Sequence, residues 1–473
     1  MALELSGLLV ANAAYFAVGL AALACFRSAS WAHLGVAFPL GLVLVAIPSS
    51  YAALVGVPVG LTATCVGAGI VAAGLWIAKP WSRLPRRPSL SRPSVGALVA
   101  LGIAAIIAVV LLYASRTFAV RPLIEWDSWA VWTAKARLLY EDPSIAARAL
   151  RSGSYGQTPY PLGLPTVEAL GFGAMGRYDP TLIGVQFILL AIAFPLALWS
   201  LLRRHARSWV IALASLSVVG APQILYQLLT HYADVPLGLF VGLGLAAAGA
   251  WLAGPGEPWL LACYAAFIGM AGITKSEGFL FALAAAIALA AAAALTRDRR
   301  RIIAAWYGIG ALLAVILPWR IYCVAYGLNT PDYDLGRLTD IHYLSAHRDR
   351  VGPVVRELWR QLDTSRYWAF LTWVILLGLV AGLLARRWRM LTFAGIWLAL
   401  SSLGLVVLYW VSSLPLESNI TNTSYRTIVS LLVGGGALTP LFVFPRPVTD
   451  SPPSSFYSSG GPVRPPETPE GAQ

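Results

Sequence analysis

Long apolar runs recur along the whole chain, and shorter polar segments separate them. A helix that crosses a bilayer needs about 20 apolar residues, because its backbone amides must be satisfied internally where water is absent. The pattern therefore predicts an all-α fold, a polytopic transmembrane helix bundle of about 13 spans. The predicted spans cover residues 7–26, 33–53, 57–78, 95–113, 181–202, 208–224, 235–253, 259–274, 278–296, 302–325, 367–385, 390–413 and 427–445.

Two segments, residues 114–180 and 326–366, are too long and too polar to be simple connections. A coil exposed to lipid is not viable, so each segment is expected to contain short helices that lie at the interface or cover the bundle. The chain then divides into a three-span N-terminal extension at 1–94, a main transmembrane domain at 95–445 and a tail at 446–473. The Pro- and Ser-rich composition of the tail predicts disorder.

The orientation of the chain follows from its basic clusters, because short cytoplasmic loops carry an excess of Lys and Arg. An even number of predicted spans separates each cluster from the next, so all of them are expected on the cytoplasmic side of a plasma (inner) membrane. The N-terminus then lies outside, as part of a retained span, and the C-terminus inside. Both long polar segments face outside. The clusters are at 79–92, 203–207, 297–301 and 386–389.

The composition excludes a water-soluble globular protein. Hydrophobic residues make up 58% of the chain and charged residues 12%, whereas about 25% are charged in ordinary soluble domains. The 34 Lys and Arg against 21 Asp and Glu give a net charge of +13. Because this excess falls on the cytoplasmic side, it reflects topology. The predicted partners therefore include membrane lipids and no nucleic acid.

Acidic and aromatic side chains gather where the first outer segment leaves its span. Glu125 and Asp127 are two residues apart, and a helix is predicted to begin at Asp127. On that helix Trp129 and Trp132 would share a face and hold the carboxylates at the level of the lipid headgroups. The alternative interpretation is that Asp127 is only a helix N-cap and the tryptophans are only an interfacial belt.

Two more acidic positions lie at predicted outer helix ends. Asp234 stands in a very short connection, and Glu277 follows Lys275 between two apolar runs. Charged groups are costly at the mouth of a membrane bundle, so they are functional candidates by default. The structural alternatives are N-capping by Asp234 and snorkelling of Lys275 to the surface.

Three further cations, Lys135, Arg320 and Arg426, are predicted at or near the outer surface, where each could bind an anionic substrate group. The pattern assigns no cofactor and leaves the need for a divalent cation open. His342 and His347 are five apart and do not form a helical metal pair. The chain has no P-loop, which argues against transport driven by ATP.

Four segments, in this order and all predicted on the outer side, carry a resemblance to a known family. The sequence resembles the GT-C superfamily of integral-membrane glycosyltransferases, including the bacterial protein mannosyltransferase and aminoarabinose transferase branches. The likeness extends from about residue 95 to about 440. The segments are EWDSWAVWTAKARLLY from Glu125, HYADVPLGLF from His231, GITKSEGFLF from Gly272 and LPWRIYCVAYG from Leu317.

The resemblance implies a sugar transfer at the outer face of the membrane. The family places a catalytic Asp or Glu in its first long outer loop, which Asp127 matches, with Glu125 as the other candidate. The implied partners are a polyprenyl-phosphate-linked sugar donor and a glycan, protein or lipid acceptor. Lys135, Lys275, Arg320 or Arg426 would stabilise the leaving phosphate, and Asp234 and Glu277 would contribute to substrate binding.

A second function class stays open on the sequence: a polytopic transporter or flippase of a lipid-linked or small solute, with Asp234, Lys275 and Glu277 as its polar path. A transporter should carry ionisable groups near the middle of the bilayer. Here they gather at outer helix ends and in the two long outer segments, which favours the transferase.

Overall fold

The structure is a computed structural model that describes residues 2–26, 33–78, 94–118, 123, 125–154, 157–328 and 335–443. All regular elements within these ranges are helices. The predicted basic loop at 79–92 and the predicted disordered tail at 446–473 lie outside the described residues.

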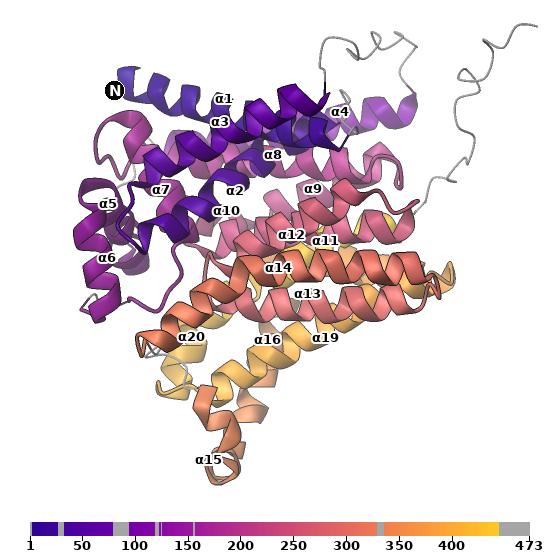
Figure 1. Cartoon of the computed structure of the whole chain (residues 1–473). Helices are drawn as coiled ribbons and strands as arrows, with labels where there is room; N and C mark the ends of the chain where they lie inside the picture. Colours follow the sequence, from indigo (N-terminus) through magenta and orange to yellow (C-terminus); the bar gives the residue numbers. More distant parts are fainter. Residues whose placement is uncertain are drawn as a thin grey trace, which may run out of the picture.

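Long helices run side by side through the molecule (Figure 1). The first half of the chain forms α1 (Ala2–Cys25), α2 (Leu34–Ala53), α3 (Val59–Ala78), α4 (Val95–Phe118), the π-helix η3 (Asp127–Trp132), α5 (Thr133–Glu141), α6 (Pro143–Ser152), α7 (Gly163–Met175), α8 (Gly184–Leu202), α9 (Ser208–Val219) and α10 (Pro222–Leu229). The second half forms α11 (Asp234–Ala253), α12 (Pro258–Gly272), α13 (Ser276–Ala294), α14 (Arg299–Ala325), η4 (Leu335–Thr339), α15 (Ile341–Ala346), η5 (Arg348–Arg350), α16 (Val351–Asp363), α17 (Ser365–Trp368), α18 (Leu371–Leu384), α19 (Trp388–Trp410), α20 (Leu416–Thr427), α21 (Val429–Leu438) and η6 (Thr439–Leu441).

Each predicted span overlaps at least one helix. Not all of these helices are long enough to cross a membrane, so their lengths do not confirm 13 spans. In the described part of the chain, nine helices are long and apolar enough to cross a membrane, or ten if α9 and α10 form one span bent by 58°. The predicted spans at 259–274, 367–385 and 427–445 correspond to α12, α18 and α21, which are shorter. Many apolar helices of this length are typical of a multi-pass membrane protein.

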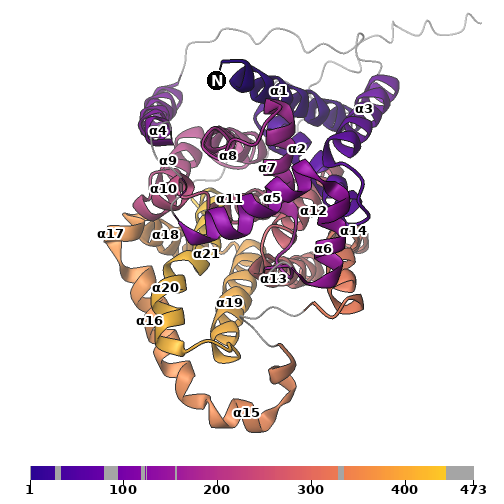
Figure 2. The same cartoon turned by 90° about the vertical axis from the view of Figure 1, so that its left-hand side faces the viewer.

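Short helices also occur in the two long polar segments. The first holds η3, α5, α6 and α7, and the second holds η4, α15, η5, α16 and α17. In the end-on view of Figure 2, α5 and α20 lie in front of the long helices, and α16 lies beside α20. These elements therefore form one end of the bundle, and the candidate site lies among them.

The N-terminal helices α1–α3 are packed onto the rest of the bundle. The backbones of α1 and α2 approach so closely that a Cβ at Gly19 would lie 1.8 Å from the carbonyl oxygen of Ala37. Asn12 on α1 donates a hydrogen bond to Gln186 on α8 over 3.0 Å, and Ser50 on α2 bonds Thr166 on α7. Close packing at small residues and interhelical polar bonds are the usual means by which helices associate in lipid.

The end of the bundle opposite the candidate site carries three of the predicted basic clusters. Arginines from the clusters at 203–207 and 297–301 both contact the turn between α11 and α12. An arginine of the cluster at 386–389 binds the end of η6, which packs on Gly249 near the end of α11. The contacts are Arg204 with Glu257 at 2.8 Å, Arg301 with the carbonyls of Leu252 and Gly254, and Arg387 with the carbonyl of Leu441.

Candidate functional site

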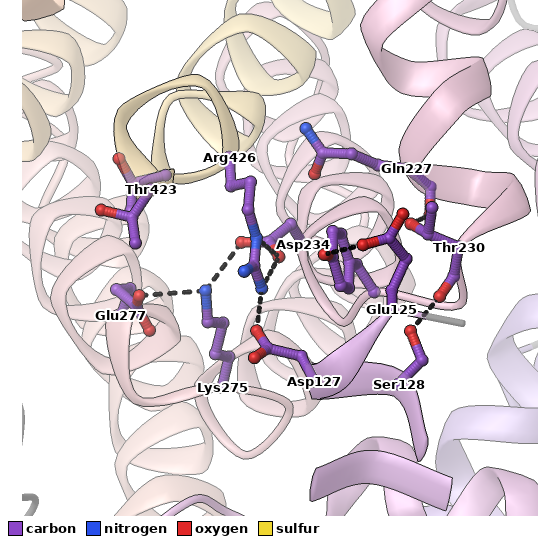
Figure 3. Close-up of polar contacts among 12 residues, drawn as sticks. Glu125, Asp127, Ser128, Gln227, Thr230, Asp234, Lys275, Glu277, Thr423 and Arg426 are labelled. Carbon is purple, nitrogen blue, oxygen red and sulfur yellow. Dashed lines mark hydrogen bonds and ion pairs between the residues drawn. The ribbon is translucent and has the colours of Figure 1, made fainter. Parts of the chain in front are cut away.

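Five of the predicted site residues converge in one network of charges, although they come from four separate segments (Figure 3). Asp127 begins η3, Asp234 begins α11, Lys275 and Glu277 flank the start of α13, and Arg426 lies in the last turn of α20. The 20 residues of α11 place this network about 30 Å from the basic end of the bundle.

Asp127 occupies the first turn of a π-helix, which the sequence did not predict. A π-helical turn holds more residues than an α-helical one and is frequent at functional sites. For this reason Trp129 and Trp132 do not share a face: Trp129 is 49% exposed and Trp132 is 1% exposed. The N-capping interpretation of Asp127 is also wrong, because its carboxylate binds Arg426 and the residue at the cap is Trp126.

Asp234 is the buried centre of the network. Its Oδ1 accepts a hydrogen bond from the Lys275 ammonium at 2.7 Å, and its Oδ2 accepts from Arg426 at 3.1 and 3.2 Å. Its side chain is 3% exposed. Two cations therefore neutralise a carboxylate that would be costly to bury alone. The carboxylate contacts these cations and does not cap α11, whose N-cap position is Ala233.

Lys275 bridges two carboxylates from adjacent helices. Besides Asp234 it binds Glu277 Oε1 at 3.1 Å. Burial by itself lowers the pKa of Lys275, but the facing Asp234 and Glu277 outweigh this effect and raise it above its ordinary value. The lysine is thus a fixed positive charge and does not snorkel to the surface.

Arg426 joins the buried and the accessible carboxylate. The Nη2 that binds Asp234 also binds Asp127, and the guanidinium lies over the ring of Tyr232 with 3.9 Å to the ring centre. Burial opposes its charge, yet Asp234 and Asp127 raise the pKa of Arg426 well above its ordinary value. A planar guanidinium suits this bridging because it has several donors in a fixed geometry.

Glu125 lies on the other side of Tyr232. Its two carboxylate oxygens accept hydrogen bonds from the hydroxyl of Tyr226 at 3.0 Å and from that of Tyr232 at 3.1 Å. The structure thus separates the two carboxylates considered for the base: Asp127 contacts the cation network, whereas Glu125 is held by phenols. The tyrosines were not among the predicted site residues, although Tyr232 stands in the same quoted motif as Asp234.

A cavity of about 170 Å³ opens beside the network. Asp127 is the most accessible acid of the network, since 27% of its side chain is exposed while Asp234 and Glu277 are nearly buried. The lining is mixed aromatic and polar, and it includes residues outside the predicted set. The lining residues are Trp126, Asp127, Val131, Trp132, Gln157, Tyr160, Lys275, Glu277, Leu414, Asn419, Thr423 and Arg426.

The remaining predicted cations, Arg320 and Lys135, stand outside this lining. Arg320 donates to the carbonyl of Ser276 at 3.1 Å and lies over the ring of Phe279, so it supports the start of α13. Lys135 is buried in α5 and binds backbone carbonyls behind the cavity wall. Within the described residues, no group of three His, Cys, Asp or Glu side chains is arranged to hold a metal ion.

Comparison of this chain with protein-family models, with curated proteins and with solved structures gives no match.

Proposed function

We propose that this protein is a membrane glycosyltransferase that moves a sugar from a polyprenyl-phosphate donor to an acceptor hydroxyl at the outer face of the plasma membrane. The observation that supports it best is the position of Asp127: an accessible carboxylate at a cavity, with fixed positive charges directly beside it. The proposal includes 13 crossings of the membrane, the N-terminus outside and the C-terminus in the cytoplasm.

The position of the site fits a donor that is held in the membrane. The network lies at one end of the long helices, and the three described basic clusters lie at the other end. With basic loops in the cytoplasm, the site faces outside, where sugar nucleotides are absent and a sugar must arrive on a lipid. A carrier phosphate at the membrane surface and an acceptor would meet at the same depth, which favours reaction by proximity.

In the proposed step Asp127 is the general base. It takes the proton of the acceptor hydroxyl while that oxygen bonds to the anomeric carbon, and the bond between this carbon and the phosphate oxygen breaks. Polyprenyl phosphate leaves with the electron pair of the broken bond. Glu125 is the other candidate for the base, but its oxygens already accept two tyrosine hydroxyls.

The cations beside Asp127 suit the charge that grows on the leaving phosphate. When Asp127 accepts the proton it becomes neutral and no longer attracts Arg426, so an Nη2 donor becomes available as the phosphate gains charge. Lys275 and, behind it, Arg320 add positive charge at the start of α13. Asp234 keeps Lys275 and Arg426 in place, and Glu277, which lines the cavity, contacts the sugar or the acceptor.

The transporter alternative is less well supported by these positions. Asp234 and Glu277 stand at the first and second residues of α11 and α13, and Arg426 stands in the last turn of α20. Charges that relay a solute should continue toward the middle of the spans.

The proposal is tested with purified protein in proteoliposomes and a panel of polyprenyl-phosphate sugars. Wild-type protein should release polyprenyl phosphate, Asp127→Asn should not, and Asp349→Asn, at an exposed aspartate of η5, should behave as wild type. Full activity in Asp127→Asn would exclude Asp127 as the base. Activity with a soluble sugar nucleotide and no lipid donor would overturn the donor class.

A further inference from the structure

One wall of the cavity is held from behind by a buried lysine. Gln157 and Tyr160 form part of this wall, and the backbone carbonyl of each accepts a hydrogen bond from the ammonium of Lys135, at 2.8 and 2.7 Å. Lys135 is only 1% exposed. Its charge is therefore directed at the backbone of the wall and not at the cavity.

The same wall contacts the helix that carries Asp127. Trp132 ends η3 and meets the ring of Tyr160 edge-on, with 5.4 Å between the ring centres. Lys135 follows three residues later in α5. Asp127, Trp132 and Lys135 thus belong to one continuous helical stretch, and the last two of them hold the segment 157–160.

At its other end the wall is joined to the turn that carries Lys275. The amide of Gly163 donates to the carbonyl of Ile273 at 2.7 Å, two residues before Lys275. A Cβ at position 163 would lie 2.5 Å from that carbonyl oxygen, so only glycine permits this approach. Segment 157–163 therefore connects the two sides of the charge network, and Lys135 and Gly163 are its attachments.

We propose that Lys135 is a positioning residue, which ties segment 157–163 to the helix after Asp127 and so sets the distance between Asp127 and the Lys275–Glu277 pair across the cavity. The geometric role stands on the contacts above, and its consequence for catalysis rests on the proposed function. Lys135 touches neither the cavity nor the reacting atoms.

Burying the ammonium of Lys135 costs free energy, and its hydrogen bonds to the wall offset part of this cost. Burial lowers the pKa of Lys135 to about 7, so the folded protein holds this ammonium at a cost. Hydrogen bonds from a charged donor to carbonyls are stronger than neutral ones and offset part of that cost. The wall that they fix presents Gln157 Oε1, which is buried and accepts no hydrogen bond from the described residues.

Hydrogen exchange tests the attachment without any substrate. In Lys135→Met the amides of 157–163 should exchange at least about tenfold faster than in wild type, while those of α11 and α13 are unchanged. Lys135→Gln, which keeps a neutral donor, should give a smaller increase and serves if the Met variant does not fold. Arg137→Met removes an exposed arginine of the same helix and should leave 157–163 unchanged. Equal protection of 157–163 in wild type and both Lys135 variants would overturn the proposal.

Kinetics then separate positioning from simple loss of stability. In Lys135→Met, kcat for the lipid-linked donor should fall about 100-fold, as expected for a misplaced reacting group, with KM changed less than threefold. A variant with faster exchange but wild-type kcat would show that the wall does not position Asp127. If wild-type protein releases no polyprenyl phosphate at all, the proposed function fails while the exchange result still stands.

Discussion

Asp127 and Asp234 bind the same nitrogen, Nη2 of Arg426, although they lie on different helices and differ in exposure. Asp234 is buried and has a second cation in Lys275, whereas Asp127 faces the cavity. The pair therefore divides two tasks. Asp234 holds the cations, and under the proposed function Asp127 is the group that reacts.

This division predicts that two similar substitutions lower the stability of the fold by unequal amounts. Asp234→Asn leaves Lys275 and Arg426 buried with one carboxylate fewer and should destabilise the fold by about 3–5 kcal/mol, as when one partner of a buried ion pair is removed. Asp127→Asn should cost less than about 1 kcal/mol, because the carboxylate is partly solvated. Unfolding of both variants in detergent, followed by temperature or denaturant, measures the difference. Equal destabilisation would contradict the assignment.

Arg426→Lys tests whether the bridging geometry matters beyond the charge. A lysine keeps the positive charge but cannot reach two carboxylates with a planar fork. We expect release of polyprenyl phosphate to fall about 10- to 100-fold, similar to the effect of other misplaced catalytic groups. Arg360→Lys, at an exposed arginine of α16 that pairs with Glu357, is the matched control and should keep wild-type activity.

Glu125→Gln distinguishes the two candidate bases. A glutamine oxygen can still accept one tyrosine hydroxyl, so the site should keep its shape and lose less than about tenfold in activity. Loss of a true general base costs about 10²- to 10⁴-fold. Assays of Glu125→Gln and Asp127→Asn side by side decide the assignment, and a larger loss in the Glu125 variant would move the base to Glu125.

The burial of Glu168 predicts that the stability of the folded protein depends on pH. This dependence does not involve catalysis. Glu168 lies in α7 with no exposure, and burial raises its pKa from 4.5 to about 8, an effect that the nearby Thr133 hydroxyl opposes only in part. The folded state favours the protonated acid. Its stabilising contribution is therefore complete below about pH 4.5 and is lost as the pH rises through about 8.

Glu168→Gln should remove this loss. At pH 9 the variant should be more stable than wild type by about 1–3 kcal/mol, the cost of an unsatisfied buried group, and at pH 5 the two should unfold alike. Thermal unfolding at both pH values provides the measurement. Glu141→Gln, at an exposed acid of α5, should have the same stability relative to wild type at both pH values. A constant difference across pH would mean that Glu168 does not titrate in this range.

The apolar pattern predicted the helices well because burial in lipid demands long apolar runs wherever a helix crosses. It left the count of 13 full spans unconfirmed, since α12, α18 and α21 match predicted spans but are shorter helices. Helix length depends on where caps and bends fall. The pattern fixes these positions poorly, as the break between α9 and α10 at Gly220 and Pro222 illustrates.

The candidate site was predictable as a set of residues but not as a geometry. Asp127, Asp234 and Lys275 stood out because charges at helix ends in an apolar chain are costly. Their convergence in one network with Arg426 depends on how the end of α20 meets the starts of η3 and α11, which no local pattern encodes. The π-helix at Asp127 was missed for the same reason, because its six residues resemble an ordinary amphipathic turn.

The arginines at the end of the bundle opposite the candidate site have two roles, one during membrane insertion and one in the folded protein. During insertion, under the proposed orientation, their charge selects the cytoplasmic side. In the folded state Arg301 and Arg387 donate to the carbonyls of Gly254 and Leu441, closing helix ends that would otherwise lack donors. Lysines there would still direct insertion, but each would lose the fork that reaches these carbonyls. The same arginines thus direct the orientation of the chain and stabilise its folded state. Once the chain is inserted in the proposed orientation, the side chains that bind these helix ends already lie next to them.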